Sequence, residues 1–247
     1  MTNAVGPRAV FGVIVPSTNT VVEHDYWSAR VPGIAYRAGS MYIPNPVMGD
    51  DEDFQALLGQ IRASIDTAVR DVLTAEPDRM VMGMSAETFW GGVAGNAAFE
   101  QRLRERTGLP VTTGASSCRA ALHELGCRRI AVFSPYQPIA DREVGRFFTE
   151  AGFDVAAVTG LRCPTAMDIA KVPDDRLREV VASLDAPDVD AIVQVGTNLS
   201  FVALADRLEQ ELGKPVLAIN AATLWHALRE HGLADRVDGA GRLLREH

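Results

Sequence analysis

The chain alternates short β-branched runs with longer stretches in which apolar residues recur at helical spacing. Helical spacing is found at 53–75, 97–106, 174–184 and 201–212. Eight short runs predict strands: AVFGVIV (9–15), GIAYRAG (33–39), DRMVMGM (78–84), LPVTT (109–113), RRIAVFS (128–134), GFDVAAV (152–158), DAIVQVG (190–196) and KPVLAIN (214–220). This order predicts an α/β fold on parallel sheets.

The second half of this pattern repeats the first. VIVPSTNT (13–20) matches VFSPYQP (132–138), VMGMSAE (81–87) matches QVGTNLS (194–200), and VTTGASS (111–117) matches AINAATL (218–224), at offsets of about 105 to 120 residues. Two copies of one βαβαβαβα unit are therefore expected. We predict a first lobe over 1–115, completed by the C-terminal helix 223–247, and a second lobe over 116–222.

Small polar residues follow most of the predicted strands. Ligands of parallel sheets bind beyond the carboxyl ends of the strands, where helix N-termini favour anions. We therefore expect one crevice lined by the loops at 16–20, 83–87, 112–117, 134–138, 196–200 and 219–223. The alternative for any single loop is an ordinary helix cap of Ser, Thr or Asn.

Composition narrows the range of partners. The chain has 247 residues, 47% of them hydrophobic, and a net charge of −8 with a pI near 5.2, which argues against nucleic acid or an anionic membrane surface. No apolar run approaches the ~20 residues of a membrane span. Residues 1–16 lack the charged start of a signal peptide, so we expect a cytoplasmic protein. No pattern in the sequence indicates the oligomeric state, and a homo-oligomer is one of the alternatives.

Motifs for common cofactors are missing. The position after the first strand holds VPSTNT where a dinucleotide site needs GxGxxG, and neither GxxxxGK[ST] nor GxSxG occurs. The five histidines are scattered, and Cys118, Cys127 and Cys163 form no CxxC, so no metal site is expected. We predict a site that uses no cofactor.

PSTNT (16–20), SPY (134–136), GTNL (196–199) and NAATLWHAL (220–228) resemble the aspartate/glutamate racemase superfamily. The closest branch is that of maleate cis-trans isomerases and arylmalonate decarboxylases. The resemblance implies two flavodoxin-like lobes with four-stranded parallel sheets, related by a pseudo-twofold axis, and a cofactor-free site in the crevice between them. It implies that substrate carboxylates are held by the following residues: Ser17 and Asn19 of PSTNT, Tyr136, Thr197, Asn198 and Asn220.

The sequence departs from the family at two positions. By resemblance, the family places a cysteine at the end of the third strand of each half: isomerases have both, and decarboxylases keep the second. Gly83 and Gly196 stand there in this chain. Glycine lets an anion approach the backbone, so both are expected to bind substrate. It cannot transfer a proton or add to a double bond, so two-cysteine racemisation and covalent isomerisation do not carry over.

Other residues are candidates to replace the thiols. Glu87, shielded by Phe89 and Trp90, is a candidate general acid or base with a raised pKa; the alternative is an acidic residue in a helix first turn. Ser85 is a candidate oxyanion donor or nucleophile. Cys163, in the loop LRCPTAMDIAKVP, can reach the site if that loop and SMYIPNPVMGD form lids.

Two classes of function follow. The first is a cofactor-independent enzyme on a small carboxylic acid, of isomerase or decarboxylase/lyase type, that stabilises an enolate or oxyanion; a hydrolase or hydratase using Glu87-activated water is its competitor. The second is a non-catalytic carboxylate-binding protein, such as a regulator within a catabolic operon.

Overall fold

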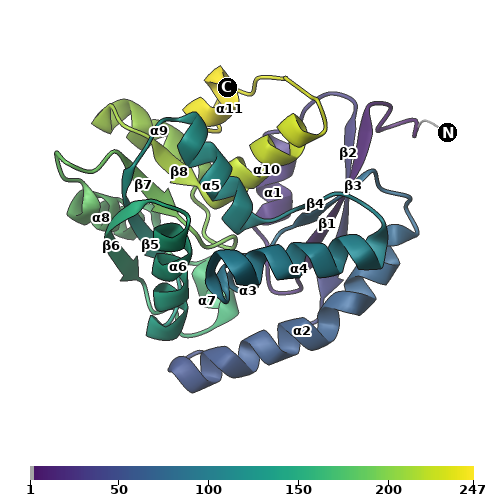
Figure 1. Cartoon of the computed structure of the whole chain (residues 1–247), viewed down its shortest axis with the longest axis horizontal. Coiled ribbons are helices and arrows are strands. Elements are labelled where there is room, and N and C mark those ends of the chain that lie inside the picture. The colour runs from purple at the N-terminus through teal and green to yellow at the C-terminus, as the bar shows by residue number, and fades with distance from the viewer. Residues whose placement is uncertain (1–2) are drawn as a thin grey trace.

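Two parallel sheets form the centre of the molecule, which a computed structural model describes for residues 3–247 (Figure 1). The first has the order β2-β1-β3-β4 and the second the order β6-β5-β7-β8. Their strands are β1 (Ala9–Pro16), β2 (Ile34–Met41), β3 (Arg79–Met82), β4 (Val111–Thr112), β5 (Arg129–Ser134), β6 (Asp154–Gly160), β7 (Ala191–Gln194) and β8 (Val216–Ala218). The identical order confirms the predicted α/β fold and its internal repeat.

The inner strands are buried because helices cover both faces of each sheet. Every residue of β3 and β7 is buried, and in β1 only Pro16 is not. The edge strand β6 is different, since none of its seven residues is fully buried. The carboxyl ends of β1, β3, β5 and β7 therefore project from a rigid core.

The predicted helical spacing corresponds to α2 (Asp51–Leu73), α4 (Gly92–Thr107), α8 (Asp174–Leu184) and α9 (Val202–Leu212). Asp50 caps α2 by accepting from two backbone N–H groups. The other helices are α1 (Val22–Ser28), α3 (Ala86–Phe89), α5 (Gly114–Glu124), α6 (Pro138–Glu150), α7 (Ala166–Ile169), α10 (Ile219–Glu230) and α11 (Arg242–Glu246). None of the helices in the described part of the chain is both long and apolar enough to span a bilayer.

The C-terminal part of the chain returns to the first sheet. In Figure 1 the yellow-green α10 lies beside the purple α1, and α10 also packs on α5, β3 and β4. From the second half, α6 packs on α2, α3 and α4. The division into a first lobe over 1–115 with the last helix and a second lobe over 116–222 stays a prediction.

Candidate active site

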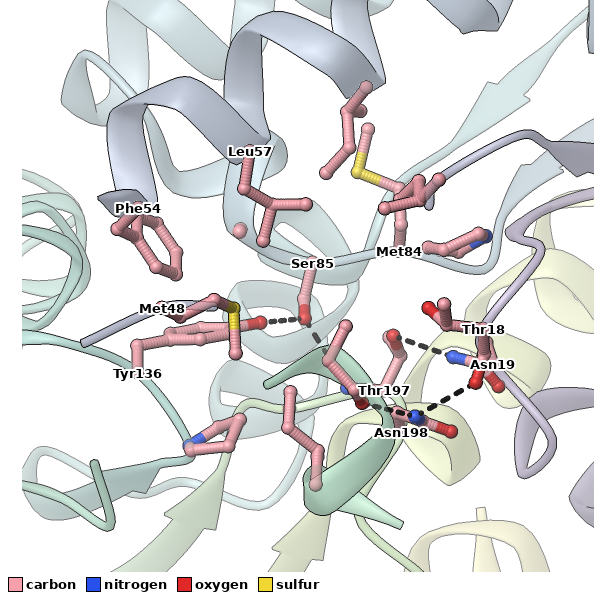
Figure 2. A pocket seen from close by; sticks show the side chains of 18 residues that line it. Thr18, Asn19, Met48, Phe54, Leu57, Met84, Ser85, Tyr136, Thr197 and Asn198 are labelled. Atoms are coloured by element: carbon pink, nitrogen blue, oxygen red, sulfur yellow. Dashed lines mark hydrogen bonds between the residues drawn. The ribbon is translucent and has the colours of Figure 1, made fainter. Parts of the chain in front are cut away.

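A cavity lies where loops from the two lobes meet (Figure 2). Its volume is about 60 Å³, on a scale on which one water needs about 10–15 Å³, so it suits a small molecule and not a nucleotide. It is lined by Pro16, Thr18, Asn19, Ile43, Met48, Phe54, Leu57, Ile61, Met84, Ser85, Ala86, Pro135, Tyr136, Ala166, Ile169, Gly196, Thr197 and Asn198.

Four of the six loops expected at the crevice line it, namely those at 16–20, 83–87, 134–138 and 196–200. The loops at 112–117 and 219–223 do not, and that part of the prediction is wrong. They begin α5 and α10, which pack on each other so closely that a Cβ on Gly114 would lie 2.7 Å from Ile219 Cδ1. This contact closes the position to a ligand.

Ser85, Tyr136 and Thr197 form a connected group at the centre of the cavity (Figure 2). The Tyr136 hydroxyl donates to the Val195 carbonyl at 3.2 Å and is in close contact with Ser85 Oγ, which accepts from Thr197 N at 3.3 Å. Burial raises the pKa of Tyr136 above its usual value, so its hydroxyl remains protonated over a wide pH range. Ser85 and Tyr136 thus lie where the sequence placed them.

Asn19 and Asn198 connect the loops that carry them. Asn19 Oδ1 accepts from Val21 N and Val22 N at 3.0 Å at the start of α1, and its Nδ2 donates to Thr197 Oγ1 at 3.3 Å. One of its amide hydrogens is left over. The Thr197 hydroxyl donates to no residue within 3–247, so its proton is also available to a ligand.

The side chain of Asn198 is used within the protein. Its Nδ2 donates to Thr18 O at 3.3 Å and Ala166 O at 3.0 Å, and its Oδ1 accepts from Thr20 N at 3.0 Å. An amide has two N–H donors, so none is left for a substrate, contrary to the prediction. Helix α9 begins at Val202, after a turn closed by a hydrogen bond from Leu199 N to Gly196 O at 3.0 Å.

Three other predicted binding residues do not line the cavity. Ser17 Oγ accepts from Ile43 N at 2.9 Å and so holds the loop above the cavity. Gly83 faces the core, where a Cβ would lie 2.6 Å from Val15 Cγ1. Asn220 lies behind the wall and donates to the Thr197 carbonyl at 2.9 Å. These three residues support the site from outside its lining.

Glu87 is also outside the cavity. Its carboxylate accepts from Arg62 Nε at 2.9 and 3.0 Å, and Arg62 in turn lies over the Trp90 ring at 5.9 Å. The pair borders a separate surface pocket on the other side of Ile61. The predicted general base is therefore a structural ion pair between α2 and α3.

No cysteine lines the cavity, and all three are buried. Burial raises the pKa of Cys163 to about 11, and the same cause raises the pKa of Cys118 and Cys127. Gly196 does line the cavity, but a Cβ there would lie 2.4 Å from Pro135 Cδ. The described residues also hold no cluster of three His, Cys, Asp or Glu side chains that suits a metal ion.

The remaining wall of the cavity is apolar, and the sequence predicted few of the residues that form it. Both expected lids contribute, through Ile43 and Met48 from one loop and Ala166 and Ile169 from the other, and an antiparallel bridge of Val47 and Thr165 joins them. Helix α2 adds three side chains, those of Phe54, Leu57 and Ile61. Their spacing in the sequence is that of any core-facing helix, so it carries no signal for a site.

Comparison with known proteins places this cavity in context. The family model for arylmalonate decarboxylase matches residues 12–244. The chain belongs to the arylmalonate decarboxylase family. Within this family it is 33% identical to arylmalonate decarboxylase of Bordetella bronchiseptica, over 95% of this chain and 96% of the relative. It is 26% identical to maleate isomerase of Pseudomonas putida, over 94% and 96% of the two chains.

Solved structures of both kinds share the fold. A mutant of arylmalonate decarboxylase in the liganded form has a TM-score of 0.83 and 25% identity, covering 97% of this chain and 100% of that one. A Nocardia farcinica maleate cis-trans isomerase mutant with a covalently bound succinylcysteine intermediate has a TM-score of 0.87 and 23% identity, covering 97% and 99%. This chain is accordingly an enzyme of the isomerase or lyase type, and its homologues act on small carboxylic acids.

Proposed function

We propose that this enzyme is a cofactor-independent lyase that decarboxylates a small acid of the malonate type bearing an apolar substituent. One observation carries the proposal: the cavity sets a wall of hydroxyl and amide groups against an apolar wall. None of the described residues that line it is Asp, Glu, His, Lys, Arg or Cys. Such a site suits a reaction that begins without a base or a nucleophile.

Decarboxylation meets this condition because the substrate itself supplies the electrons. When the C–C bond to one carboxylate breaks, CO₂ leaves and the bonding pair moves to the α-carbon, forming an enediolate with the carboxylate that remains. The hydroxyls of Ser85 and Thr197 and the free N–H of Asn19 are the donors for that charge. Tyr136, whose own proton goes to the Val195 carbonyl, contacts the Ser85 hydroxyl and holds it in place. One such donor typically contributes about 3 kcal/mol to the transition state. A proton, taken up from solvent through these hydroxyls, then completes the monoacid.

The apolar wall has a role in the same step. A carboxylate loses hydration when it faces Phe54, Leu57 and Ile61 of α2, whereas neutral CO₂ does not need that hydration. Met48 and Ile43 from the lid extend this surface around the α-substituent. The wall therefore favours the departing group over the bound carboxylate.

Other reactions have less support in this cavity. The isomerase relative from Nocardia farcinica carries a covalent cysteine adduct, and here no thiol lines the cavity. A hydrolase or hydratase that uses Glu87-activated water lacks its base, because Glu87 pairs with Arg62 outside. A non-catalytic carboxylate-binding protein is disfavoured because the relatives that match nearly the whole chain are enzymes.

The test is turnover of methylmalonate, phenylmalonate and maleate by the full chain with no cofactor added, followed by proton NMR in D₂O. We expect the malonates to give monoacids with one deuterium at the α-carbon. Ser85→Ala should lower kcat by about 10²–10³-fold through loss of a donor, and Tyr136→Phe should lower it by about 10²-fold because the Ser85 hydroxyl is no longer held in place. Tyr42→Phe is the matched control, because Tyr42 is 71% exposed. Conversion of maleate to fumarate alone, or binding of malonates without turnover, would overturn the proposal.

A further inference from the structure

A buried carboxylate lies behind the polar wall. Asp25 of α1 is only 7% exposed, and no lysine or arginine among residues 3–247 forms an ion pair with it. Its partners are Asn220 Nδ2 at 2.7 Å and the largely exposed His24, whose Nδ1 lies 3.4 Å away. Burial raises the pKa of Asp25, and hydrogen bonding from Asn220 opposes that rise. A buried charge without a cation costs stability, so a role for it is worth seeking.

Asn220 connects this carboxylate to the cavity wall. Its Nδ2 donates both to Asp25 Oδ2 and to the Thr197 carbonyl, at 2.7 and 2.9 Å, which uses both amide hydrogens. An ionised carboxylate and a carbonyl are acceptors only, so the amide can face them only with its nitrogen. Asp25 therefore fixes which way the Asn220 amide points.

The orientation of one peptide unit follows. In a planar trans peptide, the carbonyl and the next N–H point in opposite directions. Because Asn220 holds the Thr197 carbonyl behind the wall, the Asn198 N–H is directed to the other side. Thr197 and Asn198 both line the cavity, and within residues 3–247 the Asn198 N–H donates to no hydrogen bond. It is an unused backbone donor at the site.

We propose that Asp25 is a positioning residue: through Asn220 it fixes the Thr197–Asn198 peptide so that the Asn198 N–H faces the substrate carboxylate as an oxyanion donor. This inference rests on the proposed decarboxylation for its kinetic effect, but the peptide orientation itself is independent of the reaction. Asp25 touches neither substrate nor reacting atoms. Its contribution is to hold a donor that the sequence motif alone does not reveal.

The experiment compares Asp25→Ala, Asp25→Asn and Asn220→Ala in the full chain. Asp25→Ala should lower kcat for a malonate by about 10²-fold, the cost of a misplaced catalytic group, with a smaller change in KM. Asp25→Asn should restore most of that loss, because its Oδ1 can still accept from Asn220. Asn220→Ala should match Asp25→Ala, and the double variant should be no worse than either single one. Glu209→Gln is the matched control: Glu209 is 3% exposed and bonded to Arg242 N and Val216 N, away from the cavity.

A second readout does not depend on turnover. The chain has six asparagines, so ¹⁵N-asparagine labelling gives a simple amide spectrum in which Asn198 can be followed. We expect its backbone amide signal to shift in Asp25→Ala and Asn220→Ala and to stay in place in Glu209→Gln. If Asp25→Ala does not fold, Asn220→Ala decides. An unmoved Asn198 amide, or equal kcat losses in Asp25→Ala and Asp25→Asn, would overturn the inference; absence of malonate turnover in the wild type would overturn only the proposed function.

Discussion

Replacing Asn198 by alanine should destabilise the fold before it affects any ligand. The change removes three hydrogen bonds, to Thr18 O, Ala166 O and Thr20 N, at a residue that is 7% exposed. At about 0.5–1.5 kcal/mol each, their loss lowers the free energy of unfolding by about 1.5–4.5 kcal/mol. For a chain of this size, a loss of about 3 kcal/mol corresponds to a melting temperature roughly 6–12 °C lower.

Urea unfolding and calorimetry of wild type and Asn198→Ala measure this change directly. Ser200→Ala is the control, because Ser200 is exposed and lies two residues away. Titration with malonate then separates stability from binding, at a temperature where both proteins are folded. A variant that unfolds like the wild type but binds malonate about tenfold more weakly would refute this structural role of Asn198. Its side-chain amide would then be a donor to the ligand.

Three further outcomes are expected. Treatment of the native enzyme with iodoacetamide should leave its rate unchanged, because burial keeps the thiols from ionising and the pKa of Cys163 is about 11; rapid inactivation protected by malonate would contradict this. The kcat profile should stay flat up to about pH 10, since a raised pKa keeps Tyr136 protonated as pH rises past its usual value; a fall near pH 9 would contradict that direction. Gly196→Ala should lower the free energy of unfolding by about 1–3 kcal/mol through contact with Pro135, whereas Gly59→Ala, with open space around it, should raise it by about 0.5–1 kcal/mol in denaturant titrations.

The fold was accessible from the sequence because its signals are periodic and repeated. Strand β7 begins with the apolar run Ala191–Val193, and α8 has the bounds that its spacing predicted. Two copies of the same unit strengthened each assignment, since a misread element in one half would have lacked its counterpart. The end of each strand then located the site at the right edge of both sheets.

The roles of individual site residues were harder to predict. A small polar residue in a loop gives the same sequence pattern whether its side chain contacts a ligand or a neighbouring loop. Asn19 and Asn198 come from equally suggestive motifs, yet the side-chain amide of Asn19 retains a free N–H and that of Asn198 has none. Glu87 looked like an acid in an apolar setting because its partner Arg62 is 25 residues away in sequence. Only the packing of the folded chain distinguishes these cases.

The hydrogen bond from Asn19 to Thr197 and the one from Thr197 N to Ser85 join residues 178 and 112 positions apart in the chain. Contacts of such long sequence separation form late in folding, after the local elements that carry them. A nascent or partly unfolded chain therefore has no working site, however well either half has formed. Catalytic activity is accordingly a reporter of the last docking step in folding.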